Sequence, residues 1–510
     1  MTEFDLLKYI GEADDAYIMD SRRRPQKRKP RWPYALAACL LVVVLAGGGT
    51  ALFQLRNMGT AEKSTPSQEA LLQESTVETA EPSSQVSVPG ETQTTETGES
   101  YGVNLLADAV YPEAIGAEDY EAASTLWQEN QVSEETKTAL NTFAYSTAAA
   151  LLQDSEESGC YSPLSLYQTL AILASGAQGQ TRDELLSLLG QSDAETLATE
   201  AGKLYRVNYF DNEVNKLRIA NSLWLDETAG DGQKISYNQD WVLSVAANYC
   251  ASVYGAEFSQ EDTALALGQW IADNTGDMLH PSPETLNFDS NTVMAIVNTL
   301  WYKTPWAEPF EESETETGDF TTETGATVET EFMHRTDMSG SYIQTEEYTK
   351  SYLQLNQGKM ILVLPQEGVD IDRLLTEEKL WEIFENGDYD SGEVVWSIPK
   401  FETSTTYSEL AETLQSLGVT SAFELGTADF SLISDDVPLY VGQIQQGTHI
   451  VIDEEGVEAA AYSLASMEAG EGEPEELPTI EMNLNRPFLY LITANDGSTL
   501  FLGVVRNPTE

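Results

Sequence analysis

The side chains that carry out nucleophilic and acid–base catalysis are few in this chain. There are three His, at positions 280, 334 and 449, and three Cys among 510 residues. The sequence has no GxSxG or HExxH motif, no phosphate-binding glycine loop and no CxxC pair. We therefore expect no enzyme, no metal and no cofactor, and any chemistry should take place on the chain's own backbone.

One segment near the C-terminus has a spacing that suits such backbone chemistry. The stretch VIDEEGVEAAAYSLASMEAGEGEPEELPTIE, residues 451–481, is small and uncharged at alternate positions in its first half and rich in Gly, Glu and Pro in its second half. Alternate side chains of a strand lie on opposite faces, so the first half can form a strand, whereas the second half has loop composition. The uncharged set consists of Val457, Ala459, Ala461, Ser463, Ala465, Met467 and Ala469.

The charges of this segment obey the same alternation. Glu458 and Glu468 fall on the opposite face, and Glu471 is the first charge in the uncharged register. We therefore predict that residues 457–470 can leave solvent and join a β-sheet as an added strand with one buried face. A surface loop that never inserts is the alternative.

The chain as a whole is strongly acidic, with a formal net charge of −58. Such a surface repels phosphates, which argues against nucleic-acid binding and favours a cationic macromolecular partner. An acidic exterior that serves only solubility is the alternative.

The N-terminal hundred residues divide into three segments by composition. Residues 1–31 end in a basic block, SRRRPQKRKPR, and residues 32–55 contain no charge. About 20 apolar residues cross a bilayer as a helix, so we predict a signal anchor with a cytoplasmic N-terminus, a cleaved signal peptide being the alternative. Residues 56–100, rich in Thr, Glu and Ser, are predicted to be a disordered stalk.

From residue 101 the composition becomes globular, with helical patterns early and strand patterns late. Two apolar runs flank Asn495-Asp496-Gly497, which predicts a β-hairpin. Because helices and strands do not alternate regularly, we predict an α+β fold with largely antiparallel sheets in a domain of residues 101–510.

Several motifs in residues 140–510 resemble those of the serpin family, in the family's order. They are YSPLSLYQTLAILASGAQGQTRDELLSLLG (161–190), VNTLWYKTPWAEPF (297–310), IPKF (398–401), LGVTSAF (417–423), ADFS (428–431), DEEGVEAAAYS (453–463) and RPFLYLI (486–492). The resemblance implies three β-sheets, about nine helices and an exposed reactive-centre loop near the C-terminus. It also implies a suicide-substrate mechanism, in which a serine protease forms an ester with the loop, and the cleaved loop then inserts into the main sheet.

The resemblance also assigns site residues. The scissile bond falls at Gly470–Glu471, with Ala465, Met467 and Ala469 as alternative specificity residues. The loop hinge comprises Glu454, Glu455, Gly456, Val457, Glu458, Ala459, Ala460 and Ala461. The region where the sheet opens comprises Ser162, Ser165, Asn298, Trp306 and Gln446, where Gln446 replaces a His common in the family.

These residues point to an elastase-like or subtilisin-like target. No Lys or Arg lies between His449 and Arg486, so a trypsin-like pocket would find no basic side chain there. The acidic run after Ala469 should steer a cationic protease to the loop. We expect a monomeric inhibitor tethered outside a bacterial cell; a non-inhibitory surface protein with the same fold is the alternative.

Overall fold

A computed structural model describes residues 37–47, 92–94, 100–117, 119–153, 155–228, 232–281, 286, 292–408, 410–457 and 477–509. All of them belong to one compact unit that starts at Ala35. Its α-helices are α3 (Tyr120–Glu129), α4 (Glu134–Leu152), α5 (Pro163–Gly176), α6 (Gly179–Leu188), α7 (Ala194–Val207), α8 (Gln239–Asn248), α9 (Glu261–Asn274), α10 (Glu377–Glu385) and α11 (Leu410–Ser416). The nine helices in these residues agree with the number that the family resemblance implied.

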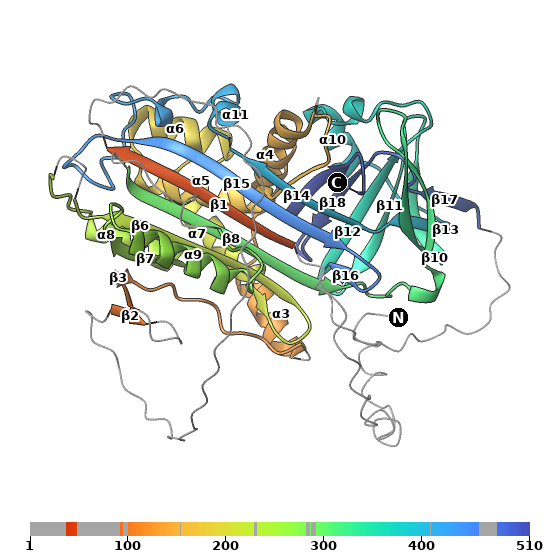
Figure 1. Cartoon of the computed structure of the whole chain (residues 1–510), viewed down its shortest axis with the longest axis horizontal. Helices are drawn as coiled ribbons and strands as arrows, with labels where there is room; N and C mark the ends of the chain where they lie inside the picture. Colours follow the sequence, from red (N-terminus) through yellow and green to blue (C-terminus); the bar gives the residue numbers. More distant parts are fainter. Residues whose placement is uncertain are drawn as a thin grey trace, which may run out of the picture. The chain divides into compact units, whose positions relative to one another are not determined.

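The first sheet has ten strands in the order β1-β15-β16-β8-β6-β7-β3-β2, with β14 beside β15 and β5 beside β6 (Figure 1). β1 also pairs with β8, so it lies between β8 and β15. Their bounds are β1 (Ala37–Gly47), β2 (Thr92–Thr94), β3 (Ser100–Ala107), β5 (Phe210–Asp211), β6 (Lys216–Asp226), β7 (Ala251–Ala256), β8 (Thr292–Pro305), β14 (Phe401–Tyr407), β15 (Leu439–Ile452) and β16 (Gly456–Val457). Both β8 and β15 run antiparallel to β1, so they are parallel to each other.

The second sheet has nine strands in the order β17-β13-β10-β11-β12-β18-β19-β4, with β9 beside β10. Their bounds are β4 (Gly159–Tyr161), β9 (Glu316–Thr321), β10 (Thr327–Gln344), β11 (Tyr348–Leu355), β12 (Gly358–Pro365), β13 (Asp390–Pro399), β17 (Thr479–Asn483), β18 (Phe488–Thr493) and β19 (Thr499–Val505). β18 and β19 pair antiparallel, which confirms the predicted hairpin.

The strands of the described residues form two hydrogen-bonded sheets, where the resemblance implied three. The reason lies in β10, which is 18 residues long. Its first part pairs with β9 and β13, and its last three residues pair with β11, past a register shift between Asp337 and Gly340. One continuous strand therefore joins what would otherwise be two separate sheets.

The most consequential difference from expectation concerns the uncharged N-terminal segment. We expected residues 32–55 to form a helix, but Ala37–Gly47 form strand β1 between β8 and β15, drawn in red in Figure 1. In the described part of the chain, no helix combines the length and apolarity that crossing a membrane requires. A segment without charge suits the middle of a sheet covered on both faces as well as it suits a bilayer, because neither offers water to polar side chains.

Ordered structure also begins before the predicted domain boundary. Thr92–Thr94 of the expected stalk form β2, which pairs with β3, and β3 itself starts at Ser100. The β-branched Thr residues suit a strand, which explains why a stretch of polar composition can pair at the sheet edge. Residues 1–31 and most of the predicted stalk lie outside the described residues.

Helix α5 packs against strands of both sheets, and its N-terminus contributes residues to the candidate site. It has buried side chains along almost its whole length, and Pro163 occupies its first turn. Ser162 caps its N-terminus by accepting a hydrogen bond from the Ser165 N–H through Oγ at 3.4 Å. A helix that is mostly apolar around its whole circumference is stable only when buried, and the N-terminus of α5 contacts Asn298 of β8 and Gln446 of β15.

Candidate functional site

Two hinge residues of the candidate loop, Gly456 and Val457, already lie in the first sheet as β16. Val457 pairs with Ile452 of β15 on one side and with Thr304 of β8 on the other. Its side chain is fully buried, at 0% exposure. Val457 is the first member of the uncharged set, so the structure places that set's face, at this position, toward the interior.

A tight turn returns the chain from β15 into this position. Asp453 Oδ1 accepts hydrogen bonds from the Glu455 N–H at 2.9 Å and from the Gly456 N–H at 3.3 Å. Gly456 has a φ of +146°, and a Cβ there would lie 2.5 Å from the Thr304 carbonyl oxygen. Only glycine fits, because both the backbone conformation and the close approach to β8 exclude a side chain.

The carboxylate of Glu454 is held by two polar partners. Thr315 donates a hydrogen bond to Glu454 Oε1 at 2.8 Å, and Lys400 Nζ lies 3.2 Å from Glu454 Oε2. Burial by itself would raise the pKa of Glu454, but the hydrogen bond from Thr315 and the charge of Lys400 lower it below the ordinary value. By contrast, burial raises the pKa of the neighbouring Asp453. Glu454 is therefore an ionised anchor at the base of the loop.

Trp306 fastens the backbone of the same turn. Its indole Nε1–H donates to the Asp453 carbonyl at 2.9 Å, and its backbone N–H donates to the Glu455 carbonyl at 3.0 Å. Phe310, which packs edge-on against Trp306 at 5.9 Å between ring centroids, donates its backbone N–H to the Glu454 carbonyl at 2.9 Å. The three successive carbonyls of Asp453, Glu454 and Glu455 thus accept hydrogen bonds from the segment that follows β8.

A second polar cluster lies deeper, where α5 meets the sheet. Gln446 Oε1 accepts from the Ser162 N–H at 3.0 Å, and Gln446 Nε2 donates to the Ser162 carbonyl at 3.1 Å. Ser165 Oγ donates to Asn298 Oδ1, and Asn298 Nδ2 donates to Asn221 Oδ1 at 2.7 Å. All five residues are buried, which makes this polar network a constraint on how β8 and β15 can separate.

The structure therefore brings together four of the five residues that we assigned to sheet opening. Trp306 belongs instead with the hinge residues Glu454, Glu455, Gly456 and Val457. The predicted hinge residues Glu458, Ala459, Ala460 and Ala461, the bond Gly470–Glu471 and the alternatives Ala465, Met467 and Ala469 lie outside the described residues. Past them, the chain re-enters the second sheet as β17, parallel to β13.

Sequence reasoning missed Lys400, Thr315 and Asn221. A signal existed for Lys400, which is the only Lys or Arg between Lys379 and Arg486 in an otherwise acidic region. An isolated cation in such a region is expected to pair with a carboxylate. Asn221 and Thr315 gave no such signal, because polar residues of their types are common at exposed positions.

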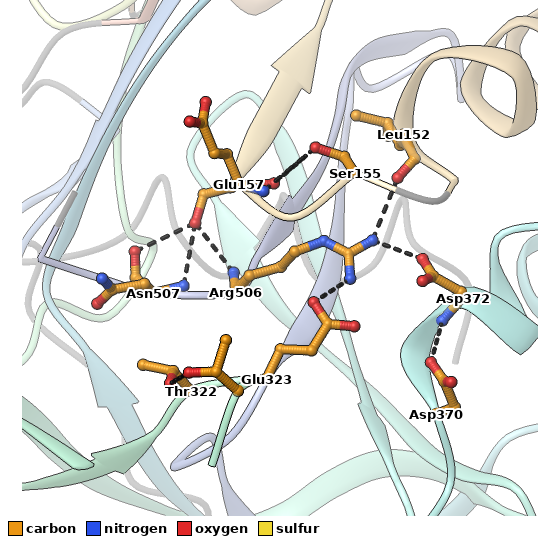
Figure 2. Close-up of polar contacts among 11 residues, drawn as sticks. Leu152, Ser155, Glu157, Thr322, Glu323, Asp370, Asp372, Arg506 and Asn507 are labelled. Carbon is orange, nitrogen blue, oxygen red and sulfur yellow. Dashed lines mark hydrogen bonds and ion pairs between the residues drawn. The ribbon is translucent and has the colours of Figure 1, made fainter. Parts of the chain in front are cut away.

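A cluster of carboxylates elsewhere resembles a cation site by composition. The oxygens of Glu323, Asp370 and Asp372 lie within 4.8 Å of one another. Figure 2 shows the guanidinium of Arg506 directed at this cluster, where it pairs with Glu323 and, at 2.5 Å, with Asp372. Arg506 also donates to the Leu152 carbonyl at 3.2 Å. Arg506 supplies positive charge that offsets the carboxylates, and its bond to the Leu152 carbonyl links the residue that follows β19 to the end of α4.

Comparison with known proteins gives one consistent relationship. The family model described as "Serpin (serine protease inhibitor)" matches residues 138–508. The chain is similar to alpha-1-antitrypsin of Meriones unguiculatus, with 27% identity over 431 residues, which cover 81% of this chain and 99% of that protein.

Two solved structures share the fold. Native tengpin, a thermophilic serpin, superposes with a TM-score of 0.65 at 24% identity, and the match covers 79% of this chain and 99% of tengpin. Human thyroxine-binding globulin in complex with its ligand superposes with a TM-score of 0.61 at 23% identity, covering 76% of this chain and all of that chain.

Proposed function

The chain belongs to the serpin family, and from this premise we propose that it is a suicide-substrate inhibitor of serine proteases. The observation that carries the proposal is the placement of Val457, which is paired on both sides and buried at the entry between β8 and β15. The loop therefore starts as a strand. Its uncharged alternation through residue 470 would let it continue as one after cleavage.

Target preference follows from the sequence of the loop. The scissile bond proposed at Gly470–Glu471 and the alternatives at Ala465, Met467 and Ala469 offer small or unbranched side chains. Such residues fit the shallow pockets of elastase-like or subtilisin-like enzymes. The acidic run that follows favours encounter with a cationic enzyme, since opposite charges raise association rates.

We further propose that the inhibitor acts at the outside of a bacterial membrane, anchored by residues 32–55. The basic block before this segment supports a cytoplasmic N-terminus. The second candidate function is a non-inhibitory carrier or surface protein, a role supported by the similarity to thyroxine-binding globulin, which binds thyroxine.

The test uses the full chain, both in solution and inserted into phospholipid vesicles. It is incubated with pancreatic-type elastase and with a subtilisin, and the products are separated in SDS. The proposal predicts an SDS-stable complex and a released C-terminal peptide that begins between residues 466 and 472. Cleavage in both conditions without any complex would favour the non-inhibitory function, and cleavage confined to residues 473–479 would contradict the proposed bond.

A further inference from the structure

The gap between β8 and β15, here called the insertion slot, is filled in this structure by a segment from the other end of the chain. β1 pairs with β8 from Ala37 to Ala46 and with β15 from Ala38 to Gly47. β16, the start of the loop, lies between the same two strands and in the same orientation, antiparallel to both. Two segments of one chain therefore enter one slot.

The register shows that they compete for the same positions. β16 pairs Val457 with Thr304 and with Ile452, and this register, continued without a shift, would place Ala460 opposite Trp301 and His449. Ala38 of β1 already lies opposite those two residues.

The agreement extends along the strand. Val42 lies opposite Val297 and Gln445, the partners that the continued register assigns to Leu464. Residues 37–44 hold the places of residues 459–466, up to the irregularities near Leu45. Since one set of backbone donors and acceptors cannot serve two strands, β1 and the inserted loop exclude each other.

Composition favours the N-terminal segment in this competition. Residues 37–47 read AACLLVVVLAG and carry no charge, whereas residues 459–469 include Ser463, Ser466 and Glu468. Larger apolar side chains and β-branched Val gain more from a buried central strand than Ala and Ser do. Residues 37–47 will therefore leave the slot only if another apolar environment is available to them. A bilayer is such an environment, and the 24 uncharged residues 32–55 are long enough to cross it.

We propose that residues 37–47 are an internal plug: while they fill the insertion slot the inhibitor is blocked, and their transfer into a membrane opens the slot to the reactive loop. The inference rests on the proposed inhibitory function only where it says that a filled slot blocks inhibition. The occupancy of the slot and its control by lipid can be measured without any protease.

A single introduced cysteine tests the occupancy. Cys39 lies opposite Thr448, and directly opposed residues of antiparallel strands have Cβ atoms about 4.5–5.5 Å apart, close enough for a disulfide after small shifts. In a full chain with Cys160→Ala and Cys250→Ala, Thr448→Cys should oxidise to a link with Cys39 in aqueous solution. His449→Cys, which is next in sequence and opposes Ala38, is the matched control and should link at least tenfold less.

Phospholipid vesicles test whether a membrane draws residues 37–47 out of the slot. When the Thr448→Cys chain is inserted into phosphatidylcholine–phosphatidylglycerol vesicles before oxidation, the yield of the link should fall at least fivefold. Equal yields for Thr448→Cys and His449→Cys in solution would overturn the plug, and an unchanged yield in vesicles would overturn its control by the membrane.

Competition is tested with a synthetic peptide of residues 457–470. The full chain with Leu41→Asp and Val43→Asp, which puts two charges into β1, should bind the peptide and gain thermal stability, while the unchanged chain in solution should not. Equal binding by both chains would contradict the competition. With elastase, the doubly substituted chain should form more SDS-stable complex than the unchanged chain; if it binds the peptide but forms no complex, the proposed inhibition fails while the plug stands.

Discussion

The side-chain amide of Gln446 exchanges two hydrogen bonds with the backbone of Ser162, accepting from the N–H at 3.0 Å and donating to the carbonyl at 3.1 Å. This contact joins strand β15 to the residue that caps α5, 284 positions away in sequence. Both residues are buried, so the two bonds are shielded from bulk water. The contact therefore connects the wall of the insertion slot to the core helix.

Gln446→Ala should destabilise the fold, because it leaves the N–H of Ser162 without its partner, while the Ser162 carbonyl keeps only the N–H of Leu166 at 3.3 Å. A buried unsatisfied polar group costs about 1–3 kcal/mol, so a loss of that order is expected in the free energy of unfolding from urea denaturation. The exposed Gln443 of the same strand provides the control, and Gln443→Ala should be nearly neutral. Equal effects of the two substitutions would show that the network contributes nothing to stability.

Val457→Glu should convert the protein from inhibitor to plain substrate. The side chain at 457 is fully buried between β8 and β15, and an unpaired charge there opposes strand formation. In vesicles, we expect the SDS-stable fraction to fall at least tenfold while loop cleavage persists. Val457→Thr, which keeps the β-branch and adds no charge, should retain most of the complex; an unimpaired Val457→Glu chain would contradict insertion at this point.

Glu184→Gln should weaken stability in a pH-dependent way. Glu184 Oε2 accepts from the N–H groups of Thr420 and Ser421 and from the Ser421 hydroxyl, each at 2.8 Å. Partial burial alone would raise its pKa, but these hydrogen bonds dominate and lower the pKa to about 2.

Since the folded-state pKa of Glu184 lies below the ordinary value of 4.5, its stabilisation is complete above that pH and is lost as the pH falls toward about 2. Urea denaturation should thus separate Glu184→Gln from the unchanged chain at pH 6 and bring the two together near pH 2. The exposed Glu329 serves as control, and Glu329→Gln should differ little in urea denaturation from the unchanged chain at pH 6. A constant difference across this range would refute the assignment.

Arg506→Leu should lower stability by about 1–3 kcal/mol, because it removes the buried guanidinium that pairs with Glu323 and Asp372 and donates to the Leu152 carbonyl. Arg506→Lys should recover part of the loss, since it restores the charge without the planar fork that reaches the Leu152 carbonyl as well. Arg373, whose side chain is 67% exposed, gives the control: thermal unfolding of Arg373→Leu should change little. A comparable loss of stability for Arg373→Leu would show that the buried contacts of Arg506 contribute no more to stability than an exposed ion pair does.

The sequence by itself determined the elements that depend only on residues close together in the chain. The hairpin at Asn495-Asp496-Gly497 follows from turn chemistry, because Asn-Asp-Gly between two apolar runs favours a tight turn. The uncharged alternation that begins at Val457 predicted which face would be buried, and the structure places Val457 accordingly. The family motifs supplied Ser162, Ser165, Asn298 and Gln446, which meet in one network.

Tertiary structure alone decided the features that depend on distant partners. Glu454 and Lys400 are 54 positions apart, and the sequence around either residue does not indicate which partner it pairs with. The fate of residues 37–47 is the clearest case. Without charge or polar alternation, they satisfy the local requirements of a membrane helix and of a central strand equally, because both environments exclude water. Residues 37–47 form a strand because β8 and β15 each offer them an edge with which they can pair.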